Sequence, residues 1–275
     1  MLFINYNASL KAARSVIAFL VFLAIVIPFS VKSQRRVVLN MPNYDQSLFH
    51  FGFVLGVNQC FASIRPIDNL PAHVFTSEFI PENDILPKPD SVIVQSISSS
   101  PIPGFVIGIL ANMRMGDHFD LRFIPSLAFG DRTINYDIIT YTPIPGGTLI
   151  DTLSIPKKIP STYIIFPIEI RYKAVRYNNF RPYLMVGAQY SLDLASNAKK
   201  REEKNANEKI VKLNPSDFFL EGGVGFDFYN EWFKFGVELK MMYGFNDILK
   251  REHNFYTDSI ERLSSKIFQL SLTFE

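Results

Sequence analysis

Apolar and polar positions alternate through residues 104–129, on both sides of a short turn at Met115-Gly116-Asp117. The apolar positions before the turn are Phe105, Ile107, Ile109, Ala111 and Met113, and those after it are Phe119, Leu121, Phe123, Leu127 and Phe129. A period of two predicts strands, because successive side chains of a strand point to opposite faces. One face is apolar and the other mixes glycine with charge, which is typical of a strand pair between lipid and a polar interior.

The same alternation recurs along the chain, and it predicts strands at 50–58, 104–114, 118–129, 162–173, 181–192, 217–228, 233–243 and 268–274. Long connections at 60–100, 130–160, 193–216 and 244–264 alternate with short turns. Transmembrane barrels show this asymmetry, with short periplasmic turns and long outer loops. We therefore predict an all-β fold, a closed antiparallel transmembrane β-barrel with long extracellular loops. Closure is required because an open sheet edge cannot satisfy its hydrogen bonds in lipid.

The glycine-rich face of these strands carries charges of both signs. A barrel of about eight strands is filled by its own side chains, and an isolated buried charge costs several kcal/mol. The inward charges must therefore pair, and we expect a structural network inside a plugged barrel that does not conduct. Its proposed members are Asp120, Arg122, Glu169, Arg171, Glu221, Asp227, Glu238 and Lys240, with Lys234 as a further candidate.

Aromatic residues gather near the expected short-turn ends of the strands. Barrels carry aromatic girdles at both membrane interfaces. The predicted periplasmic girdle consists of Phe119, Tyr172, Phe180, Tyr229, Trp232 and Phe274. A soluble barrel or sandwich is the alternative, with the apolar face inside and the charged face in water. The charge-free, Phe-rich face on strand after strand argues against that alternative.

The first 33 residues have the features of a secretory signal peptide. Lys11 and Arg14 precede an apolar core at 15–29, and Val31 and Ser33 suit cleavage before Gln34. An uncleaved anchor is the alternative, although the core is short for a spanning helix. We divide the chain into a signal peptide (1–33), an extended periplasmic lead-in (34–48) and an outer-membrane barrel (49–275).

Composition excludes several kinds of chemistry. The single cysteine, Cys60, excludes an internal disulfide and a Cys-rich zinc site, and the four histidines show no metal-ligand spacing. A formal net charge of +2 is too small to suggest nucleic acid. His118 and Asp120 share a strand face without an obvious nucleophile, and no Gly-x-Ser-x-Gly motif occurs. We expect no enzyme, no cofactor and no small-molecule substrate.

Four short motifs resemble the PorT family of outer-membrane proteins, which belongs to the type IX secretion and gliding machinery. They lie at 40–45 together with 50–58, at 119–125 with 129–132, at 178–183, and at 215–218. The resemblance covers most of the chain after the signal, and its motifs include Pro125 and Pro182 within otherwise regular strands. It implies a non-enzymatic component required for cargo secretion across the outer membrane, and it implies no catalytic residues.

Two function classes remain open on the residues alone. The first is a secretion accessory whose long loops and lead-in bind machine proteins, with outer-membrane lipid as its other partner. The second is a generic small barrel for adhesion or membrane integrity, and nothing in the strands separates the two. The sequence also leaves open whether the long loops fold over the barrel mouth.

Overall fold

The computed structural model describes residues 38–82, 84–194 and 211–275. The expected signal peptide, residues 34–37 of the lead-in and most of the charged connection 193–216 lie outside the described residues. From Leu39 to Glu275 the chain forms one compact unit.

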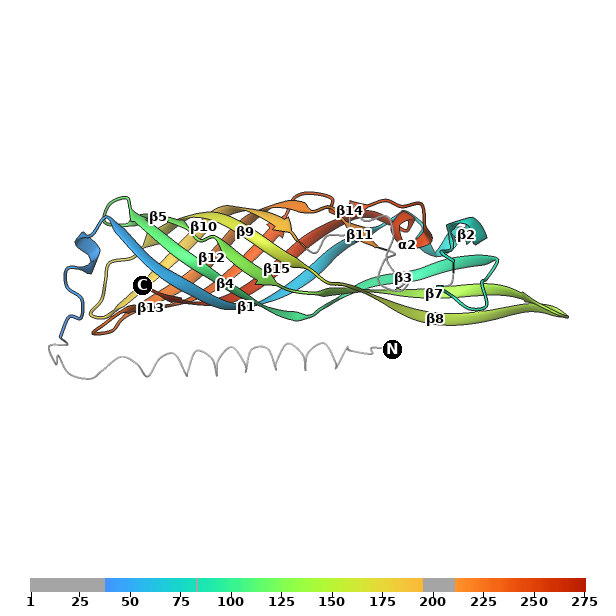
Figure 1. The fold of residues 1–275 in the computed structure, drawn as a ribbon, viewed down its shortest axis with the longest axis horizontal. Helices are drawn as coiled ribbons and strands as arrows, with labels where there is room; N and C mark the ends of the chain where they lie inside the picture. Colours follow the sequence, from blue (N-terminus) through green and yellow to red (C-terminus); the bar gives the residue numbers. More distant parts are fainter. Residues whose placement is uncertain (1–37, 83, 195–210) are drawn as a thin grey trace, which may run out of the picture. The chain divides into compact units, whose positions relative to one another are not determined.

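Nine strand segments form one antiparallel sheet that closes on itself (Figure 1). They are β1 (Phe49–Pro66), β4 (Pro103–Arg114), β5 (Phe119–Phe123), β6 (Ser126–Phe129), β9 (Thr162–Lys173), β10 (Phe180–Asp193), β12 (Ser216–Tyr229), β13 (Lys234–Gly244) and β15 (Ile260–Phe274). The order is β1-β15-β13-β12-β10-β9-β5-β4-β6, and β1 also pairs with β4. Since β5 and β6 follow one another between β4 and β9, the ring has eight strand positions. The predicted closed barrel is confirmed.

Pro125 divides one barrel strand into β5 and β6. A proline cannot donate to the ladder, and the chain passes it with adjusted hydrogen bonds. The Pro125 carbonyl accepts from the Ile109 N–H at 3.1 Å, and the Ile124 N–H donates to the Pro167 carbonyl at 3.4 Å. The barrel wall therefore stays continuous across the break.

Three tight turns lie at one end of the barrel, which we call the short-turn end. They occupy 115–118, 174–179 and 230–233. Gly116 (φ 127°) and Asn178 (φ 53°) adopt the left-handed conformation that such turns require. The beginning of β1 and the end of β15 lie at this end as well, since Phe53 is paired with Phe274.

The connections at the opposite end, the long-connection end, hold more regular structure than expected. A second sheet has the order β2-β3-β7-β8 and contains β2 (Val74–Thr76), β3 (Ser91–Pro101), β7 (Arg132–Ile144) and β8 (Gly147–Ile159). The smaller elements are η3 (Leu70–Ala72), η4 (Ser77–Phe79), β11 (Lys212–Leu213), β14 (Leu249–Lys250) and α2 (Phe255–Asp258). The interpretation of 60–66, 130–160 and 260–264 as loop was wrong, because β1, β7, β8 and β15 include these residues. The prolines of 130–160 occupy a hairpin tip (Pro143, Pro145) and an edge strand (Pro156), where no ladder donor is lost.

An apolar core fills the long-connection end. It joins inward residues of the barrel strands, such as Ala62 and Leu263, to side chains of the second sheet and of α2. Its fully buried members include Val92, Val94, Ile134, Tyr136, Ile138, Phe255 and Tyr256. The described parts of the long connections therefore pack on one core with inward residues of the barrel strands. The sequence left open whether the long loops fold over the barrel mouth, and at this end they do.

The two faces of the barrel strands differ as the alternation predicts. Outward side chains such as Phe51 and Ile109 are 70% and 67% exposed, whereas Arg122, Arg171 and Glu238 are fully buried. Among the described residues, no helix is both long and apolar enough to cross a membrane.

Replacing Gly225 with alanine tests how tightly the interior is filled. An added Cβ would approach the Tyr183 ring to 2.4 Å, so we expect Gly225→Ala to lower the free energy of unfolding by about 1–3 kcal/mol. Urea unfolding in lipid vesicles measures this loss. Gly147→Ala is the control, because its Cβ would meet nothing within 4 Å; equal stability of the two variants would contradict the packing described.

Candidate functional site

The centre of the barrel interior is built around the Glu238 carboxylate of β13. Arg122 of β5 donates to its Oε1 at 2.5 Å, and the Tyr183 hydroxyl of β10 donates to the same oxygen at 2.7 Å. Lys240 lies 3.4 Å from Oε2 and forms a closer ion pair with Glu169 of β9. Three strands that are distant in sequence are thus joined through one buried carboxylate.

A second group of ion pairs lies nearer the short-turn end. Arg171 pairs with Asp227 at 2.6 Å, and its guanidinium stacks 3.7 Å from the centre of the Tyr183 ring. Lys234 pairs with Glu275 at 2.8 Å, and Arg171 lies 3.6 Å from the same carboxylate. Because Glu275 also lies 4.0 Å from Arg122, it connects this group to the central one.

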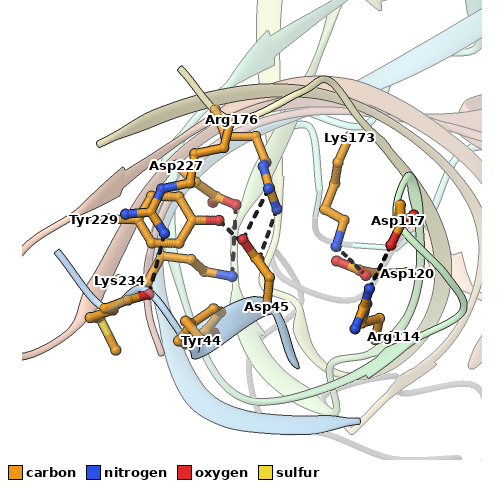
Figure 2. A network of polar contacts seen from close by, with 12 residues as sticks. Tyr44, Asp45, Arg114, Asp117, Asp120, Lys173, Arg176, Asp227, Tyr229 and Lys234 are labelled. Carbon is orange, nitrogen blue, oxygen red and sulfur yellow. Dashed lines mark hydrogen bonds and ion pairs between the residues drawn. The ribbon is translucent and has the colours of Figure 1, made fainter. Parts of the chain in front are cut away.

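Asp120 of β5 forms its ion pair with the adjacent strand β9, where it lies opposite Arg171. Lys173 of β9 lies 2.6 Å from the Asp120 Oδ1, and Figure 2 shows the two side chains facing each other. The structure thus brings seven of the eight predicted network residues into ion pairs with one another or with neighbouring charged side chains, and all of them are buried.

Glu221 is the exception. It is 3% exposed, and neither carboxylate oxygen accepts a hydrogen bond from a described residue. Beyond it toward the long-connection end, the interior holds an apolar cluster of Cys60, Phe219, Met242 and Ile267. Buried polar side chains such as Asn58, Gln189 and Arg132 lie there as well. A cavity of about 10 Å³ lies there, which is at the lower limit for one water molecule.

The lead-in packs across the short-turn end, although we had expected it to be extended. The Asp45 carboxylate accepts two hydrogen bonds from Arg181 of β10, at 2.8 and 3.0 Å. Figure 2 shows Tyr44 and Asp45 lying among Asp227, Tyr229 and Lys234. A bidentate guanidinium–carboxylate pair fixes orientation as well as distance, so the lead-in is held in one position at the barrel mouth.

Backbone contacts hold the segment before Asp45. The Asn40 N–H donates to the Asn179 side-chain carbonyl at 2.9 Å, and the Asn40 amide donates to the Tyr229 carbonyl at 3.0 Å. Arg176 of the β9–β10 turn donates to the carbonyls of Asn40 and Met41. Motif 40–45 therefore binds motif 178–183, two stretches far apart in the sequence.

Tyr44, in the short turn η2 (Tyr44–Gln46), joins the lead-in to the ion-pair network. Its hydroxyl donates to Glu275 Oε2 at 2.8 Å, and its ring stacks on His50 at 4.0 Å between centroids. Burial and the neighbouring Glu275 carboxylate raise the pKa of Tyr44 above its usual range, so the phenol stays protonated and remains a donor. We call the segment 39–48 with these contacts the plug.

The predicted girdle residues do not all lie where expected. Phe119, Tyr172 and Trp232 are exposed on the outside, and Phe180 and Phe274 pack against outward phenylalanines. Tyr229 is a correction, because it is only 2% exposed and lies inside beneath Arg176 at 3.6 Å. Its position follows from the alternation of side chains along β12, because Tyr229 lies two residues after the inward-pointing Asp227.

Six contributors to the network are missing from the predicted set: Tyr44, Asp45, Lys173, Arg181, Tyr183 and Glu275. The alternation of side chains along the strands indicates the inward position of four of them. Lys173, Arg181 and Tyr183 lie at inward-pointing positions of their strands, and Glu275 continues the inward series of Ser271 and Thr273. Nothing comparable locates Tyr44 or Asp45, because they precede the first strand.

His118, which was considered for catalysis, takes a structural contact, because its Nδ1 lies 3.1 Å from the Lys173 carbonyl. The His50 ring does the same, with its Nε2 2.8 Å from the Tyr44 carbonyl. Within the described ranges, no group of three His, Cys, Asp or Glu side chains is arranged to hold a metal ion. The polar and charged side chains of the interior therefore join the barrel strands and hold the plug across the short-turn end.

A closed ring of strands with an apolar exterior and a charged, filled interior defines the class of membrane-spanning β-barrels. The family model described as "Outer membrane protein beta-barrel domain" matches residues 33–250. The chain belongs to this family, and its place is the outer membrane. In this class the short turns face the periplasm, so we expect the plug at the periplasmic mouth.

Solved structures give remote likenesses. Neisserial surface protein A is 11% identical with a TM-score of 0.36, over 82% of this chain and 98% of that one. The outer membrane protein OprG from Pseudomonas aeruginosa is 14% identical with a TM-score of 0.32, over 81% of this chain and 93% of that one. The comparison with curated proteins finds no match.

Removing one central charge tests the network. Glu238→Gln takes the main counter-charge from Arg122, so we expect it to lower the free energy of unfolding by about 3–5 kcal/mol. Urea unfolding in lipid vesicles, followed by the fluorescence of Trp232, measures the loss. Glu261→Gln is the control, because its pair with Arg65 is 48–71% exposed and contributes about 1 kcal/mol or less. Similar losses in both variants would contradict the network.

Hydrogen exchange tests the plug. Asp45→Asn removes a charge-assisted pair of the kind that contributes about 1.5–3 kcal/mol, so amides at 40–47 should exchange at least about tenfold faster while the barrel strands stay protected. The same change at exposed Asp68, at the long-connection end, should leave the plug unaffected. Unchanged exchange in Asp45→Asn would show that Arg181 does not hold the plug.

Proposed function

We propose that this chain is a non-enzymatic outer-membrane component that protein secretion by the type IX system requires. The resemblance of four motifs to the PorT family suggests this system. The observation that carries the proposal is the mutual contact of two of those motifs, through Asn40 with Asn179 and Asp45 with Arg181. Residues that resemble the family therefore build one specific periplasmic surface.

The filled interior also favours an accessory role over a pore. Ion pairs occupy the middle of the barrel, and apolar clusters together with buried polar side chains occupy the part beyond Glu221. Cargo proteins cannot pass through such an interior. In this proposal the chain contributes through its two ends, where the plug faces periplasmic proteins and the second sheet faces outward.

Gene deletion with complementation tests the role. We expect cargo to disappear from the medium and accumulate in the periplasm of the deletion strain. Wild-type protein should restore secretion, and Asp45→Asn should restore it less well although it inserts in the outer membrane. Intact secretion with impaired adhesion or detergent resistance would instead assign a generic barrel and reject the secretion role.

A further inference from the structure

The hairpin of β7 and β8 projects along the strand direction beyond its neighbours (Figure 1). Pro145 and Gly146 form its tip, and Gly146 has a φ of 100°. Strand β3 ends its pairing at Tyr141, so the outermost residues of the hairpin have no neighbouring strand. Leu149 and Ile150 at this tip are 46% and 61% exposed.

Strand β8 is an edge of its sheet, and the hydrogen bonds show which of its groups are open. Tyr141 lies opposite Ile150, and the Tyr141 carbonyl accepts from Asp90 on the β3 side at 2.9 Å. Because antiparallel pairs alternate between bonded and non-bonded, the backbone groups of Ile150 point away from β7. The backbone groups of Thr148, Thr152 and Ser154 also point away from β7, because these residues lie two or four positions from Ile150. Of these groups, the Thr152 N–H donates to the side chain of its neighbour Asp151.

The protection of this edge is uneven. Near the barrel, Pro156 removes a donor from the open side, which is a usual device against strand addition. Farther out, Asp151 is the one charged residue of 148–154, and its side chain is exposed. An open strand edge in water is a template for another extended chain.

We propose that the outer part of β8, residues 148–154, binds an extended, non-acidic polypeptide segment of a partner protein, which adds to the sheet as a further strand. The open backbone groups specify an extended chain, and the exposed Asp151 carboxylate disfavours an acidic one. The inference concerns the outer surface and does not depend on the secretion role.

A second copy in the same membrane does not fit this edge. Two copies related by an axis along the membrane normal would present their β8 edges parallel and at equal height. Each residue whose backbone groups point outward would then lie opposite the same residue of the other copy. A parallel ladder instead requires the two strands to be offset by one residue. The edge therefore suits a different chain.

Binding of a synthetic peptide to the purified barrel in detergent tests the proposal. The probe is a short fluorescent peptide of alternating threonine and valine, and fluorescence anisotropy measures its affinity. Ile150→Pro removes one outward N–H at a position where an edge tolerates proline, and it should weaken binding at least about tenfold. Ile150→Thr keeps the N–H and should bind within about threefold of wild type.

Three results would overturn the proposal. One is no saturable binding to wild type, and another is equal binding to the Ile150→Pro variant. The third is a Thr variant as impaired as the Pro variant, because apolar contact and not strand pairing would then dominate. Partition of the hairpin into phospholipid vesicles without peptide binding would assign the tip to lipid instead. Unchanged heat-modifiable gel mobility of each variant shows that the barrel remains folded.

Discussion

The pairing of charges inside the barrel is the interaction on which the rest of this structure depends. A strand that spans lipid must turn its apolar side outward, so its polar side has only the interior to occupy. A charge there costs several kcal/mol unless an opposite charge and hydrogen bonds meet it. Glu238 with Arg122, and Glu275 with Lys234, meet this condition across strands that are distant in sequence.

The two ends of the barrel are closed by different means. At the short-turn end, polar contacts hold the plug, with Asp45 on Arg181 and Tyr44 on Glu275. At the long-connection end the connections bury an apolar core around Ile134 and Phe255. The polar contacts continue the ion-pair network of the interior, whereas the apolar core resembles that of a soluble domain.

The period of two was enough to predict the barrel, because side-chain parity decides which face meets lipid. It placed Arg122, Arg171 and Glu238 inside, and it would also have placed Tyr229 and Glu275 there if it had been followed to the strand ends. The sheet of β7 and β8 was missed because prolines were taken as loop markers, although edges and tips tolerate them. The plug could not be predicted, since its contacts join segments more than a hundred residues apart and depend on the register of the closed ring.

Planar-bilayer recording of the purified protein tests most directly whether paired side chains fill the interior. The account predicts that the inserted barrel adds no steady conductance to that of the bare bilayer. A large and steady conductance would mean that an aqueous path runs past the Arg122–Glu238 pair, and it would contradict the account.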